Sequence, residues 1–338
     1  MDKLKVGVIG AGRLGRIHAE NIAKFIPQAQ LEAIADIRVS SDQENWAKSL
    51  GVRTVSKKPE DILSDPSIEA VIICSSTDTH ADFVIAAAKA GKHIFCEKPV
   101  DMTIPKAQNA IDAAKSAGVK LQIGFNRRFD HNFARIREHV LEGGIGNVHL
   151  VKITSRDPET PPPGYVASSG GIFLDMMIHD FDMACFQAGS EITEVYASGA
   201  VLIDPEIGKA GDVDTAIVNI KFANGAIGII DNSRKAVYGY DQRVEVFGSS
   251  GAAMADNDVP NTVKLYTKNG VFGEKPLYFF LERYKDAFVR EMVSFVDAVL
   301  NGKPVAVSGE DGLESMYAAL AAGKSLKENR AVKISEVR

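Results

Sequence analysis

The chain has 338 residues, 45% of them apolar and 25% charged, which is enough for two domains of ordinary globular composition. Its formal net charge is −5, from 39 Lys and Arg against 44 Asp and Glu, and no basic cluster points to a nucleic-acid partner. No apolar run is long enough to span a membrane, and an early strand argues against a signal peptide. Because Cys74, Cys96 and Cys185 lie far apart in apolar runs, we expect a reduced, cytoplasmic protein.

The first part of the chain alternates apolar strands with helical patterns, which is the order of parallel βαβ units. Predicted strands cover residues 4–10, 31–37, 70–76, 93–99 and 120–125, and predicted helices cover residues 15–25, 41–50, 80–90 and 104–117. The expected fold class is α/β, with a doubly wound parallel sheet that binds its ligand at the carboxyl ends of the strands. We assign residues 1–124 to this nucleotide-binding domain.

The pattern changes after residue 125. A helix over 132–143, a strand over 147–157, an irregular Pro-rich loop over 158–165 and a helix over 170–184 precede strands at 194–201, 215–222, 226–233 and 243–249. Asn224-Gly225 predicts a two-residue hairpin, so the sheet is expected to be antiparallel. Residues 125–338 therefore form an α+β domain, and its helices near 281–300 and 309–327 are expected to pack back toward the first domain.

The first strand-to-helix turn carries three glycines in the GxGxxG spacing of a dinucleotide site. Gly10 permits the tight turn, Gly12 lets the backbone approach the pyrophosphate, and Gly15 lets the helix pack closely on the strand. The amino terminus of the helix then faces the anion. Because glycines also mark ordinary turns, the clear strand before them and the clear helix after them carry the assignment.

Asp36 ends the second predicted strand and bears on the choice of nucleotide. A carboxylate at this place accepts hydrogen bonds from the ribose hydroxyls of NAD and repels the 2′-phosphate of NADP. Arg38 weakens the argument, since an arginine could accommodate that phosphate. We expect NAD as the cofactor.

Glu97, Lys98 and Pro99 follow a parallel strand at the edge where such sheets bind ligands. The proline restricts Lys98 to an extended conformation, so its ammonium group is held in place. Most lysines lie in solvated loops, and that is the simpler interpretation. Beside a nucleotide, a positioned cation can orient a substrate oxygen and stabilise charge on it.

The helix predicted over residues 170–184 is apolar except for a few acidic residues and one histidine. Asp175 and His179 are four residues apart and therefore lie on one face, where the carboxylate can orient the imidazole for proton transfer near neutral pH. A satisfied, partly buried pair is equally possible from this stretch alone. A metal site would need a third ligand, and no HExxH or cysteine-rich partner occurs, so no metal is expected.

Four stretches together resemble the Gfo/Idh/MocA oxidoreductase family: "GAGRLGRIHAENI", "SSTDTHADFVIAAAKAGKHIFCEKP", "GFNRRFD" and "SGGIFLDMMIHDFDMA". Within the family, "TSRDP" and "PPPGYVASSGGIFLDMMIHDFDM" resemble the inositol 2-dehydrogenases. The resemblance implies a Rossmann domain, then a domain with a large open sheet used for dimer or tetramer contacts. It also implies that Lys98, Asp175 and His179 occupy the catalytic positions.

The resemblance also extends the predicted cofactor site beyond the three glycines, Asp36, Arg38 and Lys98. The added residues are Arg13, Leu14, Ser75, Ser76, Thr77, His80 and Glu97. "SSTDTH" stands where many family members have TPNxxH, so Ser75, Ser76 and Thr77 depart from the common pattern, although their hydroxyls can still bind the cofactor.

The predicted reaction is oxidation of a secondary hydroxyl of a cyclic polyol, myo-inositol in the first place, by hydride transfer to NAD. His179 removes the hydroxyl proton, Asp175 orients His179, and Lys98 holds the same oxygen. The candidates for binding the other hydroxyls of the polyol are Arg128, Asp157 and Tyr238. Arg128 follows the last Rossmann strand, and Asp157 ends a strand of the second domain. The alternatives are a pyranose dehydrogenase and a catalytically silent nucleotide-binding sensor.

Overall fold

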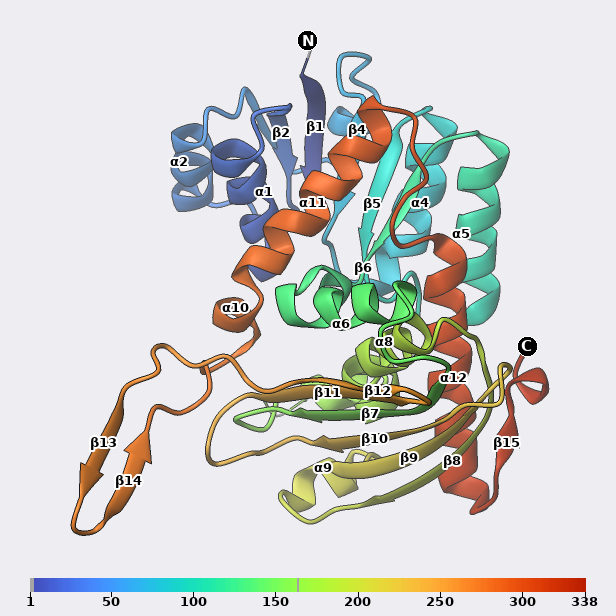
Figure 1. The fold of residues 1–338 in the computed structure, drawn as a ribbon. Coiled ribbons are helices and arrows are strands. Elements are labelled where there is room, and N and C mark those ends of the chain that lie inside the picture. The colour runs from blue at the N-terminus through green and yellow to red at the C-terminus, as the bar shows by residue number, and fades with distance from the viewer. Residues whose placement is uncertain (1–2, 163) are drawn as a thin grey trace. The chain divides into compact units, whose positions relative to one another are not determined.

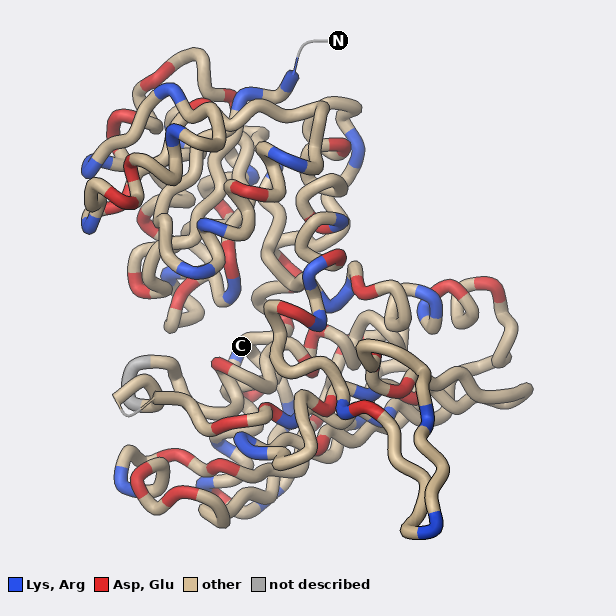
Figure 2. The backbone as a smooth tube through the Cα atoms, turned by 90° about the vertical axis from the view of Figure 1, so that its left-hand side faces the viewer, with Lys and Arg blue, Asp and Glu red and all other residues tan. Residues whose placement is uncertain are grey.

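The structure is a computed structural model that describes residues 3–162 and 164–338, and it divides into two compact units (Figure 1). The first unit consists of the residues up to Phe129 together with Asp286–Leu313. The second unit consists of Asp130–Lys285 and Glu314–Arg338. Acidic and basic residues are interspersed along the backbone of both units (Figure 2). Within the described ranges, every helix is too short or too polar to cross a membrane.

The first unit contains a six-stranded parallel sheet in the order β3-β2-β1-β4-β5-β6, which confirms the doubly wound prediction. Its strands are β1 (Leu4–Ile9), β2 (Ala29–Ala35), β3 (Thr54–Ser56), β4 (Ala70–Ile73), β5 (His93–Glu97) and β6 (Leu121–Gly124). β3 was not predicted, because three half-buried residues at a sheet edge have no apolar alternation to recognise.

Helices of the first unit come from two distant parts of the sequence. They are α1 (Arg13–Phe25), α2 (Ser41–Ser49), α3 (Glu60–Leu63), α4 (His80–Lys89), α5 (Ile104–Ser116) and α11 (Lys285–Leu300), with short 3-10 turns η1 (Thr77–Thr79) and η2 (Asn126–Phe129). Met292 and Phe295 of α11 are buried in the same apolar core as Val8 of β1 and Ile22 of α1. The core of the nucleotide-binding fold is therefore completed by residues from near the end of the chain.

The second unit contains a seven-stranded sheet in the order β12-β11-β7-β10-β9-β8-β15. Its strands are β7 (Val148–Arg156), β8 (Ile192–Ala200), β9 (Thr215–Phe222), β10 (Ile227–Ser233), β11 (Asp241–Gly248), β12 (Gly251–Ala255) and β15 (Val332–Lys333). All neighbours are antiparallel except β7 and β10, which are parallel, so the mainly antiparallel prediction is confirmed. The parallel pair brings the carboxyl ends of β7 and β10 together.

The remaining helical elements of this unit are mostly short. They are α6 (His131–Leu141), α7 (Tyr165–Ser169), η3 (Ile172–Met176), α8 (Ile178–Ala188), α9 (Pro205–Lys209), α10 (Phe280–Arg283), α12 (Gly309–Glu328) and the 3-10 turn η4 (Ile334–Glu336). The boundary between the two units lies within α12, after Leu313. The single helix predicted over 170–184 is wrong, because η3 is a π-helical turn in which the N–H of Met177 donates to the carbonyl of Ile172. Asp175 thus lies in the π turn and His179 in α8.

Two loops also differ from the predictions in detail. The Asn224-Gly225 hairpin has three loop residues rather than two, because Phe222 pairs with Ala226 and Gly225 adopts φ +87° after a tight turn. The Pro-rich loop is irregular as expected over 158–162, but Tyr165 begins α7, and Pro163 lies outside the described residues.

The large sheet has one covered and one exposed face. Val218 and Ile220, 0% and 3% exposed, point into the core on the covered face. Ile227 lies on the other face and is 55% exposed. Strand pairing places Ile217 and Phe247 on this open face as well, and both are exposed.

A separate hairpin projects from the second unit (Figure 1). It consists of β13 (Lys264–Thr267) and β14 (Gly270–Gly273), and every residue of both strands is exposed. Leu265 pairs with Phe272, and these are 60% and 53% exposed. At the base of the hairpin Arg283 forms ion pairs with Asp130 and Asp258, which anchor it to the rest of the unit.

Candidate active site

The glycine turn between β1 and α1 has the shape that a dinucleotide site requires. Gly10 has φ +92°, and a Cβ there would lie 2.5 Å from the backbone nitrogen of Ser75. A Cβ at Gly15 would lie 1.8 Å from the carbonyl oxygen of Gly10, so only glycine allows this packing of helix on strand. At Gly12 no atom lies within 4 Å of a Cβ position, which leaves open space at the amino terminus of α1. The next residues, Arg13 and Leu14, form the first turn of that helix, and backbone N–H groups at a helix amino terminus favour an anion.

Asp36 directly follows β2 and lies against the same turn. One carboxylate oxygen accepts from the backbone N–H of Ala11 at 2.7 Å, and the other accepts from the N–H of Arg38 at 2.8 Å. The carboxylate is 9% exposed, while the side chain of Arg38 is exposed. A negative charge is therefore held beside the glycine turn, and each oxygen keeps a further lone pair for a ligand hydroxyl.

The turn after β4 is built by hydroxyl groups and one histidine. The Ser75 and Thr79 hydroxyls are 2.7 Å apart, and η1 begins at Thr77, after exposed Ser76. His80, 2% exposed, has Nε2 3.0 Å from the carbonyl of Ser75 and Nδ1 2.8 Å from the carbonyl of Pro99. Because both partners only accept, the ring satisfies both when it carries two protons. His80 thus ties this turn to the turn of Lys98.

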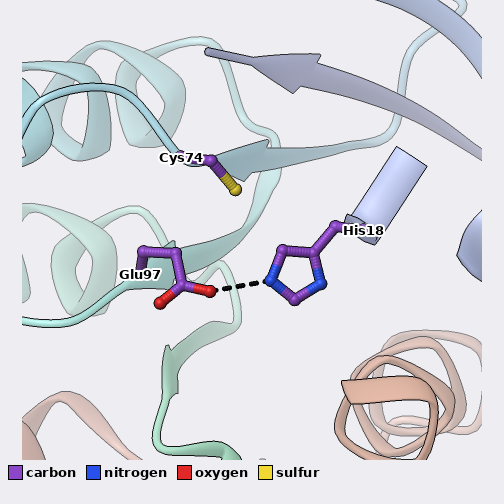
Figure 3. A group of neighbouring side chains, drawn as sticks. All are labelled: His18, Cys74 and Glu97. Carbon is purple, nitrogen blue, oxygen red and sulfur yellow. Dashed lines mark hydrogen bonds and ion pairs between the residues drawn. The ribbon is translucent and has the colours of Figure 1, made fainter. Parts of the chain in front are cut away.

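Lys98 follows β5 directly and is half-buried, and its peptide bond to Pro99 is cis. Glu97, the last residue of the strand, is 5% exposed. Its Oε1 lies 2.7 Å from Nε2 of His18, a residue of α1 that is completely buried. Figure 3 shows His18 and Glu97 facing each other, with Cys74 beside them.

His18, Cys74 and Glu97 have ligand atoms within 4.8 Å of one another, which makes them a candidate metal group. The hydrogen bond between His18 and Glu97 already uses the atoms that would coordinate. Burial, and next the charge of Glu97, raises the pKa of Cys74 well above its usual range, so the thiol keeps its proton and is a poor ligand. A second acidic group, Asp130 with His131 and Asp258, already pairs with the guanidinium of Arg283. The arrangement favours hydrogen-bonded pairs over metal centres.

Asp175 in the π turn is held from two sides. Tyr165 donates its hydroxyl to one carboxylate oxygen at 2.9 Å, and Nη1 of Arg234 donates to the other at 3.1 Å. The guanidinium is 2% exposed and the side chain of Asp175 is 14% exposed, so this is a largely buried ion pair. The guanidinium of Arg234 and the hydroxyl of Tyr165 together fix the orientation of the carboxylate. His179, half-buried at the start of α8, lies four residues further along the chain.

Asp212 organises the start of the same segment. Its carboxylate accepts from the backbone N–H of Ile172 at 2.9 and 3.1 Å, and Nη2 of Arg234 lies 3.8 Å away. Gly171 before it has φ +76°, and a Cβ there would lie 2.8 Å from the Asp212 carboxylate. Asp212 therefore caps the π turn that carries Asp175.

The three predicted substrate residues lie in different surroundings. Asp157 follows β7, and its backbone binds Ser233 and Ala236 at the end of β10, the strand that leads to Arg234. The Tyr238 hydroxyl, 41% exposed as a residue, donates to Asp241 at 2.6 Å and accepts from Arg156 at 2.9 Å. Asp157 and Tyr238 thus both lie near the carboxyl ends of β7 and β10 in the second unit.

Arg128 belongs to the first unit, where Nη2 donates to Asp311 at 2.9 Å and Nη1 to the carbonyl of Ala306 at 3.3 Å. Burial raises the pKa of Asp311, but the charge of Arg128 and hydrogen bonds from Ser308 outweigh it and lower that pKa overall. These contacts give Arg128 a structural role in the first unit. That Arg128 binds the substrate stays a prediction.

Comparison with known proteins identifies the chain. The model of an oxidoreductase family with an NAD-binding Rossmann fold matches residues 4–125, and that of the GFO/IDH/MocA C-terminal domain matches residues 133–254. This chain belongs to the Gfo/Idh/MocA oxidoreductase family. The myo-inositol 2-dehydrogenase of Thermotoga maritima is 53% identical over 99% of both chains, and the inositol 2-dehydrogenase of Rhizobium meliloti is 44% identical over 98% of this chain and 99% of its own.

A solved structure shares this fold over nearly the whole chain. The scyllo-inositol dehydrogenase from Lactobacillus casei, with bound NAD(H) and scyllo-inositol, is 33% identical and superposes with a TM-score of 0.90 over 99% of this chain and all of its own. The predicted family, α/β fold and NAD cofactor are therefore confirmed. As a family member, the protein is an NAD-dependent oxidoreductase.

The residues of the first unit fit the cofactor of the Gfo/Idh/MocA family. Open space at Gly12 and the backbone N–H groups at the amino terminus of α1 suit the pyrophosphate, and the carboxylate of Asp36 suits ribose hydroxyls. Sequence reasoning missed Arg234, Tyr165 and His18. A charged residue placed just after a strand, as in "DNSRKA", was the one available signal for Arg234.

Proposed function

We propose that this oxidoreductase converts a secondary hydroxyl of a cyclic polyol, myo-inositol, into the ketone 2-keto-inositol (scyllo-inosose). The observation that carries the proposal is the relative of 53% identity over 99% of both chains, which is named myo-inositol 2-dehydrogenase. The named relative at 44% identity supports the same class of substrate. The residues around Lys98 in the first unit and around Asp175 in the second unit supply the types of side chain that alcohol oxidation needs.

In the proposed mechanism, His179 accepts the proton of the substrate hydroxyl. Asp175, held by Arg234 and Tyr165, orients the imidazole for this proton transfer. Lys98 donates a hydrogen bond to the same substrate oxygen and stabilises the negative charge that develops there. Bound NAD⁺ accepts the hydride from the carbon as the C=O bond forms. Asp157, Tyr238 and Arg128 are proposed to bind the other hydroxyls.

A substrate panel tests this function against its two alternatives. NADH formation, measured by absorbance, is expected with myo-inositol, and scyllo-inositol, glucose and xylose serve as competing substrates. Faster turnover of a pyranose than of either inositol would replace the proposal by a sugar dehydrogenase. No turnover of any polyol, with NAD binding retained, would favour a silent sensor.

Asp36 is expected to set the preference for NAD over NADP. Asp36→Ser should weaken the binding of NAD by about 1.5 to 3 kcal/mol, because a charge-assisted hydrogen bond is lost. It should also improve the use of NADP, because the repulsion of the 2′-phosphate is removed. The measurement is the ratio of kcat/KM for the two cofactors. Asp36 accepts from Ala11 through one oxygen and from Arg38 through the other, so Asp36→Asn is a control that removes the charge, keeps one acceptor and exchanges the other for a donor. A ratio that stays unchanged would contradict the assignment.

We also propose that the protein forms a homo-oligomer, a dimer or tetramer, through its second unit. Ile217, Ile227 and Phe247 on the open sheet face are 43%, 55% and 47% exposed, which is more apolar surface than scattered residues give. The hairpin β13–β14 adds exposed apolar side chains, and an isolated two-stranded hairpin is marginally stable in water. Both surfaces suit burial against another copy of the chain.

Leu265→Ser combined with Phe272→Ser is expected to lower the oligomeric state, because the two side chains form a cross-strand pair at the hairpin surface. Multi-angle light scattering at micromolar concentration measures the change. Phe25→Ser, at an equally exposed apolar residue of the first unit, is the matched control and should leave the oligomer intact. A wild-type protein that is monomeric at these concentrations would refute the proposal itself.

A further inference from the structure

A buried group of ionisable side chains lies directly behind Lys98. His18 of α1 and Glu291 of α11 are both 0% exposed, and Glu97 of β5 is 5% exposed. His18 has Nε2 2.7 Å from Glu97 and 3.9 Å from Glu291, and its ring packs edge-on against Phe95 and Phe288. All of these residues belong to the first unit. So many ionisable groups in an apolar core need a physical reason.

The contacts of His18 indicate its protonation. Nε2 faces a carboxylate oxygen at hydrogen-bond distance and therefore carries a proton. Nδ1 is buried and has no hydrogen-bond partner among residues 3–162 and 164–338. A second proton there would be a buried donor without an acceptor, which is costlier than an unused lone pair in this aromatic pocket. The ring is therefore the neutral tautomer with its proton on Nε2.

Glu291 completes the charge balance. Within the described parts of the chain, both of its carboxylate oxygens are buried without a hydrogen-bond partner. Burial, and next the negative charge of Glu97, raises the pKa of Glu291 well above its usual range. The surroundings of Glu291 therefore disfavour a second negative charge beside that of Glu97.

We propose that His18 is a positioning residue for Lys98, acting through its hydrogen bond to Glu97. His18 is part of the helix whose first turn faces the cofactor, and Glu97 is the residue immediately before Lys98. Their bond joins the cofactor helix to the lysine turn before any ligand binds. His80 braces the same turn through the carbonyl of Pro99. The inference rests on the proposed function of Lys98 as the anchor of the substrate oxygen.

The test compares His18→Leu with His18→Gln in the full-length enzyme, with myo-inositol and NAD⁺ as substrates. Leucine removes the N–H, and kcat should fall about 10-fold or more with the KM for NAD changed less than about threefold, since a small misplacement of Lys98 is enough. Glutamine can place an N–H near the position of Nε2 and should restore most of the activity. In a Lys98→Ala background, His18→Leu should have almost no further effect, because the residue it positions is gone.

Three controls separate positioning from general damage. Phe295→Leu lowers the stability of the same core without touching the hydrogen bond and should leave kcat near the wild-type value. Glu291 lies outside the hydrogen bond between His18 and Glu97, so Glu291→Gln should also leave kcat nearly unchanged, whereas Glu97→Gln should reduce it. A loss of activity in Glu291→Gln equal to that in Glu97→Gln, or a His18 effect that is additive with Lys98→Ala, would overturn the inference.

A measurement on the wild-type enzyme needs no variant and no turnover. Nitrogen-15 chemical shifts of the His18 ring should correspond to the neutral tautomer with the proton on Nε2, and an imidazolium or the other tautomer would refute the proposed charge distribution. If instead Lys98→Ala retains full activity, the proposed function of Lys98 fails. The two failures are therefore distinguishable.

Discussion

Replacing Lys98 or His179 by alanine is expected to lower turnover by roughly 10²-fold or more, because each removes a group that is proposed to act only on the reacting oxygen. Lys98→Ala removes the cation proposed to stabilise charge on that oxygen, and His179→Ala removes the proposed proton acceptor. Binding of NAD should remain largely intact in both, since the glycine turn and Asp36 are untouched. Steady-state kinetics with myo-inositol, together with titration of NAD by fluorescence, measure the two effects separately.

The pH profile gives an independent check on His179. Oxidation should become slower as pH falls, because an imidazole that already carries two protons cannot accept the substrate proton. The primary isotope effect with deuterated inositol shows whether hydride transfer limits the rate under these conditions. A flat profile from roughly pH 6 to 9, with the chemical step rate-limiting, would be evidence against His179 as the base.

Arg234→Met should damage both stability and catalysis. The substitution leaves the carboxylate of Asp175, 14% exposed, without the guanidinium that faces it, and breaking a buried ion pair in this way costs about 3 kcal/mol. Without this partner the side chain of Asp175 would no longer be held in place to orient His179 as proposed, and kcat should fall by about 10-fold or more. Urea denaturation and steady-state kinetics are the measurements.

Arg135→Met is the matched control for this prediction, because Arg135 forms a surface pair with Glu138 in the same unit and both side chains are more than half exposed. It should change the unfolding free energy by less than about 1 kcal/mol and leave kcat unchanged. Arg234→Lys keeps the positive charge but loses the planar guanidinium group. Its unfolding free energy and its kcat should therefore lie between those of Arg234→Met and those of the wild type. Wild-type kcat in Arg234→Met would show that Asp175 does not need this partner.

The nucleotide half of the molecule was largely predictable because its signals are local. Gly10, Gly12 and Gly15 stand between a strand and a helix, and the apolar runs of β1, β4 and β5 are continuous, as expected for strands buried on both faces. Short elements without a periodic pattern, such as β3 and α3, were not found.

The partners of the candidate catalytic residues could not be predicted in the same way. Arg234 is 59 residues from Asp175 in the chain, and His18 is 79 residues from Glu97. Such contacts depend on strand order, for example on the parallel pairing of β7 with β10 inside a mainly antiparallel sheet. The π turn was also missed, and the carboxylate that binds its first N–H, Asp212, is 40 residues away in the chain. Local periodicity contains no information on either.

The return of α11 into the first unit has a consequence for biosynthesis. Met292, Phe295 and the buried Glu291 are part of the core of that unit, yet the ribosome makes them long after β6 is finished. At ordinary translation speeds the interval between Phe129 and Leu313 lasts roughly 10 to 40 seconds. During this time the nascent nucleotide-binding unit exposes the apolar surface that α11 will cover. The cell must therefore protect an unfinished domain while it translates nearly the whole of the other.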